Sequence, residues 1–394
     1  MRTFYTCLLI ASLASHVNGQ WVQMPSPTPA NLWSMAFFTE NMGYMNTNAQ
    51  LLKTVDGGET WTLTTHPGNV DGDFSFPSST VGYMAGFSDY IKKTTNAGAS
   101  WTTININNQS LPIYSVSFPD VNTGYVVGIN GFIRKTTNGG ATWTAQSVSG
   151  SPSLRHVHFV NPNLGTAIGT NGAIRRTTNG GATWSSIAGA PATSLEDIFF
   201  LDENIGFIVG GSGTMLKTTN GGANWSLVNT GTTEALYSVC FRNAMEGYVG
   251  GTSGFMMKTT NGGLTWVTED NPIYLSTQHI DDIAWKNGHW ITIGSGGRIS
   301  RNAGNVGIAD RTGGGPAFML SPNPASDRVA IHGRDPQVAM RTVRVFDVRG
   351  GLVLATTLTG DVAQLDVAGL GDGLYLLEVN EGAVSGRLKL MVQH

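Results

Sequence analysis

Charged residues are scarce in this chain of 394 residues. Asp, Glu, Lys and Arg make up 12% of it, against a typical share of about 25% in soluble domains, and the formal net charge is -3. Asn, Thr, Ser and Gly must therefore carry much of the surface. Because there is neither a basic balance nor a dense run of Lys and Arg, we expect no nucleic-acid partner and no anionic-membrane partner.

Cysteine and long apolar runs are also scarce. The chain has two cysteines, Cys7 and Cys240, and Cys7 falls in the expected leader, so the mature chain would keep one thiol and no internal disulfide. The apolar run from Phe4 to Leu13 is well short of the roughly 20 residues that a membrane span needs, and no other stretch approaches that length. We expect no transmembrane span.

The start of the chain has the composition of an export signal. Arg2 comes first, the apolar run follows it, and small residues lie around Val17 to Gly19. This order is typical of a secretory signal peptide. We therefore predict residues 1–19 as a cleaved signal and a mature protein that begins near Gln20.

One short phrase recurs six times along the chain. One copy reads Lys135-Thr-Thr-Asn-Gly-Gly-Ala-Thr-Trp143. The closing tryptophans stand 40 to 42 residues apart, at Trp61, Trp101, Trp143, Trp184, Trp225 and Trp266. A period near 41 residues with several short strands per unit is typical of a β-propeller, so roughly the first 310 residues form one body.

Each unit contains four short strand patterns, which is the content of one propeller blade. In one unit these are Ile113 to Phe118, Gly124 to Gly128, Phe132 to Thr136 and the segment from Trp143 onward. Corresponding segments recur throughout the repeat. The first pattern of each unit would form the innermost strand of a blade.

The last unit is incomplete. It ends in a degraded phrase, Ile299 to Asn305, that has no tryptophan, and Trp21 stands 40 residues before Trp61. We therefore predict seven blades, the last of which is completed by the segment at Trp21 pairing near Arg298 to Arg301. Such a closure removes an exposed sheet edge.

The phrase itself predicts a hairpin. Asn or Asp before Gly favours one, because the Asx side chain bonds forward to backbone N–H groups and Gly accepts positive φ. Asn96-Ala97-Gly98 is the one loosened copy. The phrase resembles the Asp-box, or BNR repeat, of sialidases, sortilin-type receptors, two-propeller xyloglucan hydrolases and photosystem II assembly-factor propellers. The resemblance implies a structural hairpin at the blade rim, remote from any active site.

Basic residues form a ring by repetition. One stands eight positions before every phrase tryptophan, at Lys53, Lys93, Lys135, Arg176, Lys217 and Lys258. The resemblance to assembly factors implies that a basic patch can bind protein, but repetition in every blade favours a framework role, with the aliphatic stem over a neighbouring strand. A second basic residue precedes the first in three blades only, at Lys92, Arg134 and Arg175. These three form an alternative binding stripe.

Variable residues stand just before or at the start of each innermost strand, where propellers place ligand contacts around the central channel. Aligned on apolar positions, one site holds Ser34, Asp73, Ser115, His156, Asp197, Ser238 and Asp282, and the site before it holds Trp33, Gly72, Tyr114, Arg155, Glu196, Tyr237 and Asp281. Solvated strand ends would vary too, but variation toward charged and aromatic types is where specificity can reside. The candidate ligand-binding residues are Trp33, Asp73, Tyr114, Arg155, His156, Glu196, Asp197, Tyr237, Asp281 and Asp282.

Catalysis is the alternative use of this set. Asp73, Glu196, Asp197, Asp281 and Asp282 could supply the carboxylate pair of a glycoside hydrolase. The sialidase pattern, however, requires an Arg-Ile-Pro start, which the sequence lacks, and xyloglucan hydrolases use a cleft between two propellers. No nucleophile elbow or phosphate-binding loop occurs. We therefore name no catalytic residue.

A metal is the other alternative. His156 and His158 lie on one face of a strand pattern, with Asp197 at the equivalent position of the next blade. A solvated or packed histidine pair is the simpler interpretation. We expect neither a metal nor another cofactor.

The composition changes at Thr312-Gly-Gly-Gly-Pro316, which predicts a flexible linker over residues 313–317. Beyond it, apolar and polar positions alternate between turns and predict a small β-sandwich over residues 318–394. Pro322-Asn323-Pro324, Gly373-Leu374-Tyr375 and a last strand containing Lys389 resemble the C-terminal sorting domain of type IX secretion cargo in Bacteroidota. The resemblance implies passage across the outer membrane and removal of the tail, with release or surface attachment.

Together these patterns predict an all-β protein, with a seven-bladed β-propeller over residues 20–312 and a small C-terminal β-sandwich domain. The expected function is that of a secreted or cell-surface binding module for a protein or glycan, with the type IX secretion machinery as a partner during export. An extracellular glycoside hydrolase and a photosystem-assembly-factor-like protein scaffold are the alternatives.

Overall fold

The computed structural model describes residues 21–64, 68, 72–86, 89–106, 111–302, 318–321, 325–333, 340–347, 351–359, 362–381 and 384–394. The predicted signal peptide, the linker and the Pro322-Asn323-Pro324 motif lie outside these residues. The chain divides into two compact units, residues 1–304 and 305–394. Strands dominate both units, and no helix in the described part of the chain is long and apolar enough to cross a membrane.

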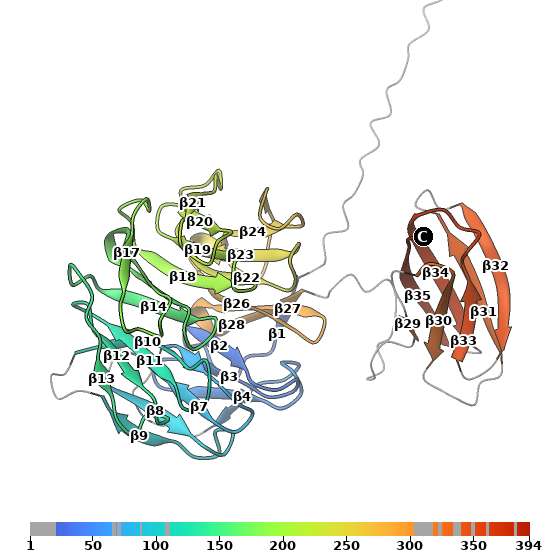
Figure 1. The fold of residues 1–394 in the computed structure, drawn as a ribbon. Helices are drawn as coiled ribbons and strands as arrows, with labels where there is room; N and C mark the ends of the chain where they lie inside the picture. The colour runs from blue at the N-terminus through green and yellow to red at the C-terminus, as the bar shows by residue number, and fades with distance from the viewer. Residues whose placement is uncertain are drawn as a thin grey trace, which may run out of the picture. The chain divides into compact units, whose positions relative to one another are not determined.

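Seven four-stranded sheets make up the first unit, which confirms the predicted blade number (Figure 1). The innermost strands are β2 (Ser34–Phe37), β6 (Phe74–Ser75), β10 (Ile113–Ser117), β14 (Leu154–Phe159), β18 (Leu195–Phe200), β22 (Leu236–Phe241) and β26 (Ile280–Lys286). Each innermost strand contacts that of the next blade, and β26 contacts β2. The sheets therefore form a closed ring around a central channel.

The remaining strands of each blade follow outward in chain order. The second strands are β3 (Gly43–Asn46), β7 (Gly82–Met84), β11 (Gly124–Gly128), β15 (Gly165–Gly169), β19 (Gly206–Gly210), β23 (Gly247–Gly251) and β27 (His289–Gly294). The third strands are β4 (Leu51–Thr54), β8 (Tyr90–Thr94), β12 (Ile133–Thr136), β16 (Ile174–Thr177), β20 (Met215–Thr218), β24 (Met256–Thr259) and β28 (Arg298–Asn302). The outer strands are β5 (Thr62–Thr64), β9 (Thr102–Asn105), β13 (Thr144–Ala145), β17 (Ser185–Ile187), β21 (Ser226–Leu227), β25 (Val267–Thr268) and β1 (Trp21–Met24). Short 3-10 turns, η1 (Thr170–Gly172), η2 (Thr252–Gly254) and η3 (Ser295–Gly297), link second and third strands in three blades.

Strand β1 closes the ring, as the degraded last phrase predicts. It pairs antiparallel with β28, from Trp21 opposite Asn302 to Met24 opposite Ile299. Trp21 is buried, and its indole Nε1 donates a hydrogen bond to Glu269 Oε1 at 2.9 Å. The first and last strands of the ring thus share one sheet, which removes the edge that an open blade would expose.

Each phrase forms a hairpin between the third and outer strands of its blade. In the third blade, Asn138 Oδ1 accepts a hydrogen bond from Thr142 N at 2.9 Å. Gly139 has a φ of 63°, in the left-handed region that glycine adopts without steric cost. In the loosened copy, Ala97 takes this place with a φ of 55°. The hairpin geometry therefore survives the loss of one glycine.

The phrase tryptophans pack inside the blades. Trp184 is buried and meets the ring of Phe159 edge-on, with 5.8 Å between ring centroids and 87° between the planes. The other five make the same kind of contact, namely Trp61 with Phe37, Trp101 with Phe76, Trp143 with Phe118, Trp225 with Phe200 and Trp266 with Phe241. These edge-to-face pairs join the hairpin to the innermost strand.

Four of the six repeated basic residues tie their blade to the next one. Lys135 Nζ donates to Gly180 O at 2.6 Å, and Tyr125 Oη donates to the same carbonyl at 2.8 Å. Equivalent bonds run from Lys93 to Gly139, from Arg176 to Gly221 and from Lys217 to Gly262. Lys53 and Lys258 lie over the rings of Tyr44 and Tyr248. The ring of basic residues therefore belongs to the framework, as its repetition predicts.

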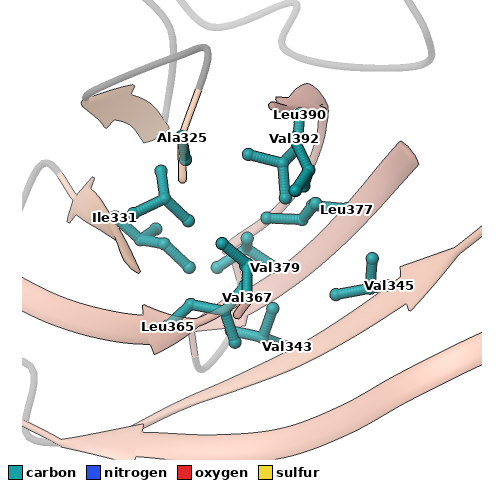
Figure 2. Packing of buried hydrophobic residues seen from close by; sticks show 11 residues of the cluster. Ala325, Ile331, Val343, Val345, Leu365, Val367, Leu377, Val379, Leu390 and Val392 are labelled. Carbon is teal, nitrogen blue, oxygen red and sulfur yellow. The ribbon is translucent and has the colours of Figure 1, made fainter. Parts of the chain in front are cut away.

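The second unit is a β-sandwich. One sheet has the order β29 (Phe318–Ser321), β30 (Arg328–Gly333), β33 (Val362–Asp366), and the other has the order β32 (Leu352–Thr359), β31 (Met340–Phe346), β34 (Gly373–Glu381), β35 (Val384–Val392). Alternate apolar side chains of both sheets meet in one core, among them Ile331, Leu365, Val343 and Val379 (Figure 2). The sorting-domain sequence thus has a hydrophobic core of its own.

We expect Trp184→Ala to lower the free energy of unfolding of the propeller by about 3 to 5 kcal/mol, because it removes a large buried ring from a blade core. Leu264→Ala is the control, since Leu264 lies in the sixth phrase and is 76% exposed. Its effect should stay within about 0.5 kcal/mol. Urea unfolding measures both variants. A Trp184 variant as stable as the parent would show that the phrase tryptophans are not structural.

Candidate functional site

The central channel contains a hollow of about 490 Å³ to which all seven blades contribute. Nine of the ten candidate residues line it, namely Trp33, Asp73, Arg155, His156, Glu196, Asp197, Tyr237, Asp281 and Asp282. Tyr114 is half-buried and is not part of this lining. The alignment of the repeat therefore identifies residues that the fold brings together around one space.

A β-bulge separates the two variable positions of each blade. In five blades the register of the innermost strand shifts by one residue near its start, and the extra residue is Tyr114, Arg155, Glu196, Tyr237 or Asp281. A bulge leaves its extra residue outside the ladder and re-aims the side chain. We call these five residues, with Trp33 and Gly72 from the equivalent positions before β2 and β6, the mouth row.

The next residue of each blade belongs to a second row, which we call the belt and which consists of Ser34, Asp73, Ser115, His156, Asp197, Ser238 and Asp282. Belt side chains bind the backbone of the following blade. Asp197 Oδ2 accepts from Val239 N at 2.9 Å, and Asp282 Oδ2 accepts from Met35 N at 2.8 Å, across the closure of the ring. The belt is therefore an inter-blade contact as well as part of the channel wall.

Serine hydroxyls continue the belt. Ser115 Oγ donates to Asp73 Oδ2 at 2.7 Å and accepts from Val157 N at 3.2 Å. Ser238 Oγ donates to Asp282 Oδ1 at 3.0 Å in the same way. A hydroxyl both donates and accepts, so a serine can link a neighbouring carboxylate to the next backbone N–H.

His156 joins carboxylates from two other blades. Its Nδ1 lies 2.9 Å from Asp197 Oδ1 in the next blade, and its Nε2 lies 3.6 Å from Asp73 Oδ2, two blades back. Burial alone would lower the pKa of His156, but the hydrogen bond to Asp197 and the charges of Asp73, Asp197 and Asp282 raise it to about 9. The imidazolium is therefore the stable form at neutral pH, and both ring nitrogens carry a proton.

His158 is in a different environment from His156. Burial lowers the pKa of His158 to about 4, and the charge of His156 adds to this effect. Its ring stacks on Phe200, with 5.7 Å between centroids. In the part of the chain that the structure describes, no three His, Cys, Asp or Glu side chains form a group that could hold a metal ion. The raised pKa of His156 and the lowered pKa of His158 make the first a buried cation and the second a packed neutral ring.

Burial also acts on the acids of the channel. It raises the pKa of Asp281 and of Asp282 to about 7. For Asp282 the charge of Asp197 adds to the rise, while hydrogen bonds from Met35 and Ser238 oppose it. These two carboxyl groups therefore hold protons more tightly than exposed aspartates do.

The mouth row presents flat rings and charges. Trp33 is 39% exposed, and its indole Nε1 donates to Asn48 Oδ1, which fixes the orientation of the ring. Arg155 Nη1 lies 3.7 Å from Glu196 Oε2 in an exposed pair. Tyr237 is half-buried. Burial raises the pKa of its hydroxyl group, and the charges of Asp281 and Glu196 raise it further. Aromatic surface and charge thus lie close together at the mouth.

The alternative basic stripe is packed onto its own blades. Lys92 is 8% exposed, and its Nζ donates to Thr103 Oγ1 at 2.7 Å. The Arg134 guanidinium lies over Phe132, 4.5 Å from the ring centroid. Arg175 Nη2 donates to Ser149 O at 2.8 Å. These three cations already have partners within the fold.

Sequence reasoning treated both variable rows as equivalent, and it missed the role of Ser115 and Ser238 as links between blades. It also missed the apolar lining from Phe37, Phe199 and Trp285. The position of the serines in the repeat is a signal that could have identified the belt. The sequence gives no such signal for the apolar lining, because apolar residues at these positions are typical of any β-strand.

Two family models match the chain. Residues 13–114, 110–192 and 190–278 match a family described as photosynthesis system II assembly factor YCF48. Residues 320–393 match the secretion system C-terminal sorting domain, which confirms the predicted sorting tail and implies a secreted or cell-surface location. No curated protein matches the chain in sequence.

Solved structures resemble the first unit. YCF48 bound to D1 peptide is 19% identical, with a TM-score of 0.61 over 74% of this chain and 97% of that one. YCF48 from Cyanidioschyzon merolae is 20% identical, with a TM-score of 0.61 over 72% and 98% of the two chains. The WD40 beta propeller domain of Doa1 is 11% identical, with a TM-score of 0.55 over 72% and 95%. At these identities the similarity shows the propeller fold alone.

The charge of His156 predicts a pH dependence of stability. Its folded pKa is raised from 6.5 to about 9, so its stabilising contribution is complete below the unfolded pKa and is lost as the pH rises through about 9. We expect the Tm of the propeller to fall between pH about 6.5 and about 9, and this part of the fall to be absent in His156→Asn. Thermal melts across this range measure it.

An NMR titration of the histidine side chains checks the same prediction directly. His156 should titrate near 9, and His158, near 4, is an internal reference on the same strand. A His156 resonance that titrates at 6.5 would show that the two carboxylates do not hold the proton.

Proposed function

We propose that this chain, which belongs to the family of the photosystem II assembly factor YCF48, is an exported binding module whose ligand occupies the mouth of the propeller channel. The observation that carries the proposal is the hollow lined by nine of the ten candidate residues. Its wall combines apolar rings with a few polar groups from all seven blades, a composition suited to ligand recognition.

The C-terminal unit supports the location of this function. The sorting domain over residues 320–393 directs the chain toward secretion or the cell surface. We propose that the tail is removed after export and that the propeller acts outside the cell, released or attached to the surface. Because the chain is exported in this way, we propose an extracellular ligand rather than a photosystem subunit.

Binding fits the site better than glycoside hydrolysis. A hydrolase needs two carboxyl groups that face one bond, free to give and accept protons. Here Asp73 and Asp197 share the imidazolium of His156, and Asp282 accepts hydrogen bonds from Met35 and Ser238. These three acids are committed to the belt and Glu196 is paired with Arg155, so only Asp281 lacks a hydrogen-bonding or ion-pair partner among the described residues, and we propose a non-catalytic role for the site.

Substituting Trp33, Arg155 and Tyr237 together by Ala should abolish ligand binding without lowering the Tm. All three belong to the mouth row rather than to the belt, and surface positions seldom contribute more than about 0.5 kcal/mol each to folding. The whole chain and the variant are compared for capture of material from cell-surface extracts and for binding and cleavage of a panel of extracellular polysaccharides.

The control for this experiment replaces Leu227, Leu264 and Val267 by Ala, because these side chains are exposed at or near outer strands, away from the mouth. Capture by the control but not by the mouth variant supports the proposal. Equal capture by both would move the binding surface away from the channel, and cleavage of a polysaccharide would favour the hydrolase alternative.

Deleting residues 316–394 should leave a folded propeller trapped in the periplasm. The propeller keeps all seven blades in this deletion, because the last described strand of the ring ends at Asn302. Cell fractionation in a host with the type IX route, together with the Tm of the recovered protein, measures the outcome. Undiminished secretion of the shortened chain would contradict the role of the tail.

A further inference from the structure

The channel concentrates acidic groups in a chain that has few charges. Five carboxyl groups line the hollow, from Asp73, Glu196, Asp197, Asp281 and Asp282, against the guanidinium of Arg155 and the imidazolium of His156. The whole chain has 26 acidic and 23 basic residues, so its composition does not predict such an excess at one place. The hollow therefore has an acidic character of its own.

Four of the five carboxyl groups already have partners. Asp73 and Asp197 contact His156, and Asp282 accepts hydrogen bonds from the next blade, as described above. Glu196 is paired with Arg155 at 3.7 Å, with side-chain exposures of 22% and 43%. A pair this exposed is weak, about 0 to 1 kcal/mol, so Arg155 holds Glu196 only loosely.

Asp281 is different from the other four. Its Oδ2 is buried and accepts no hydrogen bond from any residue in the described part of the chain. A buried carboxylate oxygen without a donor is costly, and burial raises the pKa of Asp281 to about 7 for this reason. The Asp281 side chain lines the hollow, so a positively charged group of a ligand there would favour the ionised form.

Aromatic rings lie on the same mouth row. Trp33 is 39% exposed and is held in place by Asn48. Burial raises the pKa of Tyr237, and the nearby charge of Asp281 adds to this rise. A cation over an indole or phenol ring gains stabilisation from the ring quadrupole, and an aliphatic stem gains contact with the ring face. The planar guanidinium suits both a ring and a carboxylate.

We infer that the mouth binds an extended polypeptide segment through an arginine or lysine side chain, whose cation meets Asp281 and whose stem lies against Trp33 and Tyr237. This inference rests on the proposed function and names the ligand class for the same site. A hollow of about 490 Å³ accommodates a few side chains at most, which favours a short segment over a folded domain. The already partnered cations of Lys92, Arg134 and Arg175 give no comparable site for an acidic segment.

Calorimetric titration of the whole chain tests the inference with defined probes. These are a peptide of six arginines, a peptide of six glutamates, a neutral xyloglucan oligosaccharide and spermidine. We expect the arginine peptide to bind and the glutamate peptide not to bind. Binding should weaken from about 20 mM to about 300 mM salt, because the Debye length shortens over this range.

Variants identify the contact. Asp281→Asn should weaken binding of the arginine peptide about tenfold or more, as expected for a lost hydrogen bond to a charged group. Arg155→Ala should strengthen it, because it removes the competing guanidinium from the mouth, so the loss expected of the triple variant would come from Trp33 and Tyr237. The matched control is Glu40→Gln, which makes the same change of charge at an exposed residue three positions after the end of β2. It should leave the affinity unchanged.

The outcomes separate this inference from the proposed function. Failure of the arginine peptide to bind, or unchanged affinity in Asp281→Asn, would overturn the inference. Spermidine that binds as tightly as the peptide would overturn the commitment to a polypeptide. If the glutamate peptide or the oligosaccharide binds instead, and the Trp33, Arg155 and Tyr237 triple variant loses that binding, the proposed function stands while the inference fails.

Discussion

In four of the six phrases the carbonyl of the first glycine, at Gly139, Gly180, Gly221 or Gly262, accepts from a basic residue of the preceding blade and holds the two blades together. Gly180 O accepts hydrogen bonds from both Lys135 and Tyr125 of the preceding blade. The carbonyl is positioned by a turn in which Gly180 has a φ of 62°, so the glycine, the basic residue and the tyrosine form one unit.

The inner ends of the blades are held by a less uniform device. Any belt side chain that can accept from the backbone N–H of the next blade serves, whether it is the hydroxyl of Ser115 or the carboxylate of Asp197. Four belt residues of two types, Ser115, Asp197, Ser238 and Asp282, share this role, whereas His156 binds carboxylates instead. Part of the sequence variation that suggests ligand specificity is therefore variation among side chains that make the same contact between blades. The bulged residues of the mouth row lie outside the ladder, so they can vary without weakening the contacts between blades.

Much of the fold could be predicted from the sequence, because a repeat fixes register. Trp21, standing 40 residues before Trp61, was sufficient to predict the strand that completes the seventh blade. The division of the site could not be predicted in this way. Arg155 and His156 are adjacent in the sequence. An alternating pattern of apolar and polar residues does not reveal the bulge, which places Arg155 in the mouth row and leaves His156 in the belt. The bulge depends on how the strand meets its partner, which is a tertiary property.

Charge is distributed so that the framework and the mouth differ in sign. The six basic residues of the ring and the three of the stripe, nine of the 23 Lys and Arg, face carbonyls, hydroxyls or aromatic rings. The acids converge on the channel, where carboxylates repel one another unless a cation lies between them. His156 is that cation for Asp73 and Asp197, and it is a fixed part of the fold. Asp281 Oδ2 accepts no hydrogen bond from any described residue, and burial raises the pKa of this carboxyl group to about 7, so a cation brought by a ligand would favour its ionised form.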